Sequence, residues 1–146
     1  MSQQNGQSVA SDILDAVVAA LGGNAAGAWR CRFKPFAKAE LPAKNVIPED
    51  DDPEYQNTGD IERRMRFHVR YTAAAVDGAD LVADAQYVSG TKLLMADRTL
   101  GEACKILREV GSKWEREQAE TQLIALTVTY EAEFSTTTND PSIPGY

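Results

Sequence analysis

The chain has 146 residues, a hydrophobic fraction of 43%, a charged fraction of 25% and a net charge of −7. This composition is typical of one globular domain that can bury a core, and its acidic balance disfavours nucleic-acid binding as the main activity. The N-terminal residues carry no secretion signal and no apolar run approaches the roughly 20 residues of a membrane span, so we expect a soluble protein made in a cytoplasm.

The first predicted element is an amphipathic helix. Residues 1–7 are polar, and we expect them to be disordered. Ser8 or Ser11 can cap a helix that ends at Gly22. The apolar residues of this helix recur at helical spacing: Leu14, Val17, Val18 and Leu21.

A basic strand followed by a long loop is predicted next. In the stretch AWRCRFKPF, the inward residues Trp29, Cys31 and Phe33 alternate with basic residues until Pro35. Residues 35–60 contain further prolines and the acidic run EDDDPE, so we interpret them as a long acidic loop with a short extended piece at AKNVI. Loops of this length in compact domains usually have a function.

The stretch RRMRFHVRYTA predicts a second strand by its alternation. Its inward residues are Met65, Phe67, Val69 and Tyr71, and its outward residues are Arg64, Arg66, His68 and Arg70. After a turn at VDG, a second helix is predicted from its apolar positions: Leu81, Val82, Ala85, Val88 and Met95.

Thr99 and Glu102 form a capping-box pattern that predicts a third helix ending at Gly111. Its apolar face is expected to contain Leu100, Ala103, Cys104, Leu107 and Val110. We interpret SKWERE as a short strand around Trp114.

The closing strand has the clearest alternation in the chain, and one of its faces is apolar. The inward residues are Ile124, Leu126, Val128, Tyr130, Ala132 and Phe134. The whole pattern predicts an α+β fold, a mostly antiparallel β-sheet with about three helices packed on one face. We expect a single domain at residues 8–135 and an extended C-terminal tail at 136–146.

Charged residues on the outward side of the predicted strands are candidates for a subunit interface. Arg64, Arg66 and Arg70 lie on one strand, and Glu131 and Glu133 lie on another. In one interpretation these residues pair with each other across neighbouring strands. In the other, an acidic partner or the loop of a neighbouring copy, with Asp50, Asp51 and Asp52, meets the basic strand.

The tail STTTNDPSIPGY contains few apolar residues and cannot bury enough surface to order alone. We expect it to order against a neighbouring subunit with Ile143 and Tyr146 as anchors; the alternative is a frayed terminus without a role.

No arrangement of residues in the sequence indicates catalysis. His68 is the only histidine, which excludes a histidine-based triad or a multi-histidine metal site within one chain. Asp50, Asp51 and Asp52 could bind a hard cation, but the spacing of a calcium loop is missing, and we favour a solvated loop. The phosphate-binding glycine motifs and CxxC are also missing. We therefore expect no enzyme activity and no catalytic, cofactor or metal site.

Taken in order, several segments resemble the tail terminator proteins of long-tailed bacteriophages, of the minor tail protein U type. These segments are LPA at 41–43, RMRFHVRY, ADRTLGEACKILREVG at 96–111, the segment at Trp114, and ALTVTYEAEFSTTTNDP. The resemblance covers residues 9–141.

The resemblance implies a structural virion protein at the head-proximal end of the tail, assembled in the host cytoplasm. Such proteins form a homo-oligomeric ring, expected to be a hexamer, that caps the tail tube, stops its polymerisation and offers a surface for head-tail joining. The implied partners are further copies, the tail-tube protein and the connector or neck proteins. The genome would pass through the ring without specific binding, and no membrane is involved. Two alternatives stay open: a head-completion or neck protein, and a soluble protein-binding module unrelated to phage.

Overall fold

The computed structural model describes residues 6–56, 59–118 and 122–145, except for the side chains of residues 117, 118 and 122. The predictions for residues 1–5 and for Tyr146 lie outside the described residues. The main elements are α1 (Val9–Ala20), β1 (Ala28–Arg30), β2 (Ala43–Tyr55), β3 (Asp60–Ala75), α2 (Ala79–Met95), β4 (Ile106–Gln118), β5 (Gln122–Thr137) and β6 (Asp140–Pro144). Two 3-10 turns lie at Asn24–Ala26 and Lys38–Glu40.

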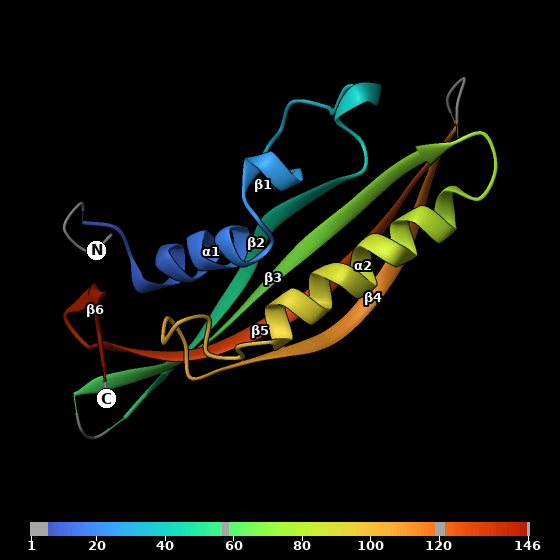
Figure 1. Ribbon diagram of the computed structural model, residues 1–146. Helices are drawn as coiled ribbons and strands as arrows, with labels where there is room; N and C mark the ends of the chain where they lie inside the picture. Colours follow the sequence, from blue (N-terminus) through green and yellow to red (C-terminus); the bar gives the residue numbers. More distant parts are fainter. Residues whose placement is uncertain (1–5, 57–58, 119–121, 146) are drawn as a thin grey trace.

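The strands form one six-stranded sheet in the order β1-β2-β3-β5-β4, with β6 paired to the end of β5. Among the described pairs, β1 with β2 is parallel and the others are antiparallel. Both α-helices lie on the same side of the sheet (Figure 1), which we call the covered face; the other side is the open face. The α+β, mostly antiparallel prediction is confirmed, but the described residues form two α-helices and not about three.

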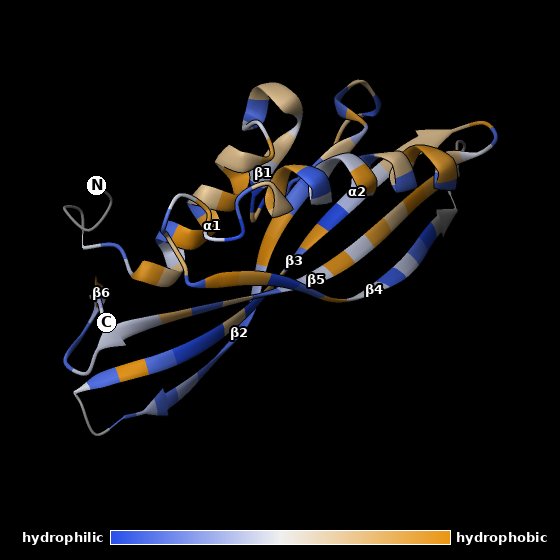
Figure 2. Cartoon of the chain, turned by 60° about the horizontal axis from the view of Figure 1, so that its bottom comes forward, coloured by the Kyte–Doolittle hydropathy of each residue, from blue (hydrophilic) through white to orange (hydrophobic). Residues whose placement is uncertain are grey.

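The alternation of β3 and β5 places apolar side chains on the covered face. The four inward residues predicted for β3 are at most 3% exposed, and the six predicted for β5 are at most 7% exposed. Hydrophobic and hydrophilic residues alternate along β3 in Figure 2. Because β3 and β5 pair directly, for example Phe67 with Tyr130, their inward side chains form one continuous apolar surface.

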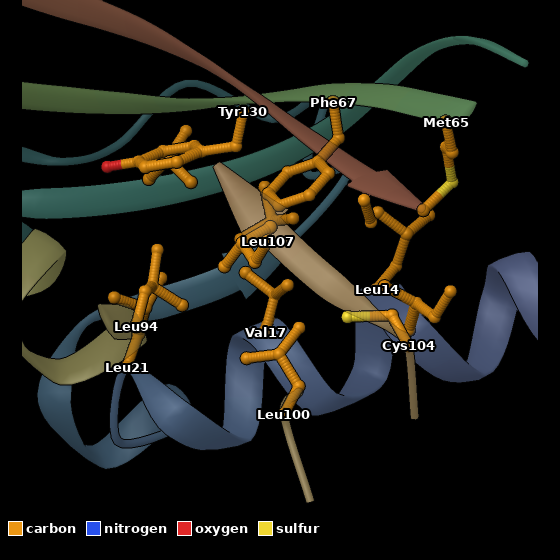
Figure 3. Packing of buried hydrophobic residues seen from close by; sticks show 14 of the residues in the cluster. Leu14, Val17, Leu21, Met65, Phe67, Leu94, Leu100, Cys104, Leu107 and Tyr130 are labelled. Carbon is orange, nitrogen blue, oxygen red and sulfur yellow. The ribbon is translucent and has the colours of Figure 1, made fainter. Parts of the chain in front are cut away.

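α1 covers part of this surface. Ser8 caps the helix, as predicted, because its Oγ accepts a hydrogen bond from the backbone N–H of Ser11 at 3.1 Å. Ile13 and Val17 are fully buried. In Figure 3, Val17 lies beside Leu107 and below Phe67, in a core that α1 shares with β3, β4 and β5.

α2 packs mainly through small residues, and its predicted apolar stripe was only partly right, because Val82 and Met95 pack against the core whereas Leu81 and Val88 are exposed. Its buried residues are Ala79, Ala83, Gly90 and Leu94, while Leu81 is 71% exposed. A Cβ on Gly90 would lie 2.7 Å from the hydroxyl oxygen of Tyr71, so glycine allows the helix to approach this ring closely. Because α2 lies this close to the sheet, only small side chains fit between them at this position.

The buried hydroxyl of Tyr71 is hydrogen-bonded to the hydroxyl of Tyr130 at 2.9 Å. Tyr130 is also hydrogen-bonded to Thr91 Oγ1 on α2, at 2.9 Å. Burial raises the pKa of both tyrosines. The hydrogen bonds among these three hydroxyl groups remove the cost of burying them without a partner.

The predicted third helix is absent from the described residues 99–111, and this prediction was wrong. A turn precedes β4, which begins at Ile106. Asp97 holds the turn through bonds from the backbone N–H groups of Thr99 at 3.0 Å and Gly101 at 2.8 Å. Leu100 and Glu102 have left-handed backbone conformations that interrupt a helix. Leu100, Cys104 and Leu107 are nevertheless buried, which explains why their spacing resembled that of a helix.

The predictions for residues 29–60 also need correction. β1 ends at Arg30, and Phe33, predicted to face inward, is 93% exposed. Much of the predicted acidic loop is strand, because β2 continues through the acidic run to Tyr55. A basic neighbouring strand makes this possible, since opposite charges on paired strands stabilise a sheet.

Candidate functional site

The acidic run of β2 lies beside the basic strand of the same chain. In the antiparallel register, Asp50 is opposite Arg66 and Asp52 is opposite Arg64, both pairs on the open face. Asp51 points to the covered side, where its carboxylate lies 2.6 Å from the guanidinium of Arg63. The acidic segment that one interpretation assigned to a partner or a neighbouring copy therefore lies beside the basic strand of its own chain.

Glu131 and Glu133 lie between two basic strands. Glu131 is 8% exposed and lies 3.4 Å from Arg66 on β3 and 3.9 Å from Arg108 on β4. Glu133 lies 3.6 Å from Arg64 and 2.9 Å from Arg108. These contacts agree with the interpretation that the charged residues pair with each other across neighbouring strands. A subunit interface at these residues stays a prediction.

Two further pairs extend along the open face. Arg70 donates to Glu115 at 2.9 Å. His68 Nδ1 lies 2.8 Å from Glu49 Oε1, so this outward residue has a carboxylate partner. The open face therefore carries a network of ion pairs between neighbouring strands. Among the described residues, no group of three or more His, Cys, Asp or Glu could hold a metal ion, and the described helices include none that could span a bilayer.

The C-terminal tail pairs with its own sheet, which corrects the prediction that it orders only against a neighbour. Thr136 is opposite Pro144 in the β5–β6 pair, and Gly145 donates to the carbonyl oxygen of Ser135 at 2.9 Å. Backbone hydrogen bonds, which do not depend on apolar burial, order this segment. Ile143 remains 48% exposed, and Tyr146 lies outside the described residues.

A pocket of about 380 Å³ lies where α1, the turn before β4, the end of β5 and β6 meet. We call it the pole pocket; its main lining side chains are Val9, Asp12, Glu102, Lys105, Phe134 and Pro144. Both carboxylate oxygens of Asp12 are buried and have no hydrogen-bond partner in the described part of the chain. Nothing in the sequence pattern indicated this pocket.

Residues 31–42 form an arm between β1 and β2, and sequence reasoning missed it. Arg32 organises the arm: its guanidinium lies over the rings of Trp29 at 4.7 Å and Phe36 at 4.4 Å, and it binds both carboxylate oxygens of Glu40 at 2.7 and 2.9 Å. The hydrogen bonds from Arg32 lower the pKa of Glu40 to about 2.

Asn45 on β2 ties the arm to the sheet. Its Oδ1 accepts from the backbone N–H of Arg32 and its Nδ2 donates to the carbonyl oxygen of the same residue, both at 2.9 Å. The arm therefore has a defined shape although it contains little regular structure. An arginine flanked by Trp29, Phe36 and Glu40 was the signal for it in the sequence, but their order did not show which residues meet.

No family model matches the sequence, and no curated protein matches it. Among solved structures, the chain is similar to one from "Virion of native gene transfer agent (GTA) particle", with a TM-score of 0.42 and 15% identity. The match covers 86% of this chain and 92% of the other chain.

Proposed function

We propose that the chain is a structural virion protein of the tail terminator type, which joins with further copies in a ring and caps a finished tail tube. The observation that carries this proposal is the open sheet, whose two outer edges differ. β4 pairs only with β5 among the described strands, and Arg98 binds the backbone N–H and carbonyl oxygen of Leu107, so the other edge of β4 is available beyond Leu107. β1 covers β2 only at residues 44–46, so the edge of β2 beyond them is also available in the described structure.

Unpaired strand edges favour contact with another chain. The two edges lie at opposite ends of the strand order, and residues 49–54 make one of them strongly acidic. A contact between two different patches is heterologous, and repetition of such a contact generates a closed ring when its rotation permits. A structural role needs no catalytic group, and the resemblance of residues 9–141 to tail terminators leads to the same proposal.

The test is to measure solution mass by light scattering, to image the same sample by negative stain, and to add purified tail-tube subunits. We expect rings, or tube ends whose growth stops when the protein is added. Lys113→Glu on β4 should weaken both effects because it places a negative charge at the edge that meets acidic β2. Lys92→Glu, the same charge change on exposed α2, is the matched control.

A protein that stays monomeric and leaves tube growth unchanged contradicts the proposal. Binding to the portal side and not to tube ends would indicate a head-completion or neck protein instead.

A further inference from the structure

The pole pocket contains a carboxylate that lacks a partner. Both oxygens of Asp12 are buried and accept no hydrogen bond from the described residues. A buried carboxylate without a partner is costly, and a cation or a strong donor removes this cost. Lys105 also lines the pocket, but its Nζ lies 2.8 and 2.9 Å from the carboxylate oxygens of Glu62.

The rest of the pole pocket limits what can fill it. Glu102 adds a second negative charge, while Val9, Phe134 and Pro144 provide apolar wall. Val9 and Phe134 are 4% and 2% exposed, so the wall belongs to the core and is fixed in position. A group that binds in this pocket should therefore combine an apolar part with a positive charge.

The tip of the arm has this combination. Phe33 is 93% exposed, and the next residue, Lys34, is also exposed. An aromatic ring in this position is a common anchor of protein interfaces. The arm needs little ordering on binding because Arg32 fixes it, also through a bond from its Nε to the carbonyl oxygen of Lys34 at 3.1 Å.

The tip of the arm does not fill the pole pocket of its own copy. The chain enters the arm from Arg30, which binds Ser11 and Asp15 on α1. Phe33 is nevertheless 93% exposed, and Figure 1 shows the arm at the top and the segments around the pocket toward the left. The exposed tip and the pocket are therefore both open to another copy.

Resting on the proposed ring, we propose that the arm of one copy docks in the pole pocket of the next. Phe33 packs against the apolar wall, and the Lys34 ammonium group binds the Asp12 carboxylate. The contact joins two different patches, so each copy offers one arm and one pocket, as a head-to-tail ring requires.

The test begins with sedimentation equilibrium of full-length variants. The arm variant Phe33→Ser with Lys34→Glu should weaken self-association by about 30-fold, the loss expected for an interface anchor. Asp12→Lys should weaken it similarly, and Asp12→Lys combined with Lys34→Asp should restore much of it because the charges are exchanged. Lys38→Glu, the same charge change elsewhere on the arm, should leave association unchanged.

A mixture of variants tests the direction of the contact. The arm variant keeps its pocket and the Asp12→Lys variant keeps its arm, so an equal mixture should form particles of two copies and no larger ones. Circular dichroism of each variant checks that the fold is retained. If Asp12→Lys proves unfolded, Glu102→Lys at the same pocket replaces it.

Three results would overturn the inference: a wild-type chain that stays monomeric at millimolar concentration, an arm variant that associates like wild type, or association that depends on the pocket but not on the arm. The last result would assign the pocket to a different occupant.

A measurement of tube capping by the same variants distinguishes failure of this inference from failure of the proposed function. An arm variant that caps tubes as wild type does refutes the docking alone, while association through arm and pocket without capping refutes the terminator role alone.

Discussion

On the covered face of the sheet, stability depends on how well large side chains fit, whereas the open face depends on charge pairs between long side chains. Phe67 and Tyr130 are fully buried on the covered face, with their rings stacked and their centroids 5.6 Å apart. On the open face, the Arg66 and Arg108 side chains that pair with Glu131 are 49% and 45% exposed. The comparison teaches that the covered face contributes most of the stability of the fold, while the open face tolerates changes of charge at a smaller cost.

The largest expected effect is at the centre of the covered face. Phe67→Ala should lower the free energy of unfolding by about 3–5 kcal/mol, because it removes a buried ring and leaves a cavity. Urea denaturation followed by circular dichroism measures this loss. Phe33→Ala, the same substitution on the exposed arm, is the control and should leave the free energy of unfolding nearly unchanged. Equal losses for the two variants would contradict the assignment of Phe33 to the surface.

A smaller loss is expected where α2 meets the sheet. In Gly90→Ala, the added Cβ would lie 2.7 and 2.8 Å from two atoms of Tyr71, whose ring is held by Tyr130. Overpacking of this kind costs about 1–3 kcal/mol, and the better helix propensity of alanine offsets about 1 kcal/mol. Thermal unfolding should show a net loss of about 1 kcal/mol. A stabilised Gly90→Ala variant would disprove the close approach.

Gly111→Ala is the matched control for that substitution. Its added Cβ would meet no described atom within 4 Å, and its φ angle lies outside the left-handed region. The same chemical change should therefore produce no steric cost at this position.

The open face should respond through charge. Glu131→Gln keeps the side-chain volume but removes two cross-strand ion pairs, so we expect a loss of about 1 kcal/mol. Added salt should reduce the difference from wild type because the paired arginines are half exposed. Chemical denaturation in urea at low and high salt measures both effects. Glu115→Gln removes the pair with Arg70 at a more exposed site and should cost less; a larger cost there would reverse our ranking.

The smallest effect is expected on the arm and depends on pH. The pKa of Glu40 is lowered from 4.5 to about 2, mainly by Arg32. The ionised form therefore stabilises the arm fully above pH 4.5, and this contribution is lost as the pH falls toward about 2. Fluorescence of Trp29, measured in a Trp114→Phe background, should change over this range.

Glu40→Gln supplies the comparison for the pH experiment. It should remove this component of the fluorescence change, because an amide cannot titrate. An unchanged pH profile in Glu40→Gln would show that another group controls the arm.

The central strands could be predicted from sequence because their two faces meet different surroundings. Met65 and Val128 alternate with polar residues, and this period of two defines a half-buried strand. The turn before β4 could not be predicted in the same way. Leu100, Cys104 and Leu107 reach one core from a turn and a strand, so their spacing imitates a helix although Gly101 has a left-handed φ.

The candidate interface was only partly predictable. The alternation of apolar and polar residues predicts that Arg66 and Glu131 point outward. It does not predict that their strands are neighbours, because this depends on pairing between distant parts of the chain. The arm depends on contacts within residues 29–45 whose pairing the order of residues did not show, whereas the pole pocket depends on segments far apart in sequence, such as Asp12 with residues near Phe134. Patterns within one segment contain no information on contacts between distant segments.

The place of β3 in the sheet also has a consequence during synthesis. β2 and β3 can form a hairpin early, but the other neighbour of β3 is β5, whose Val128 pairs with Val69 and whose Thr137 pairs with Asp60. Until the ribosome has released β5, a nascent chain exposes the apolar side and one free edge of β3, a state prone to aggregation. Chaperones that shield nascent chains should therefore bind this protein until its C-terminal part emerges, and folding should be completed only after translation has passed residue 137.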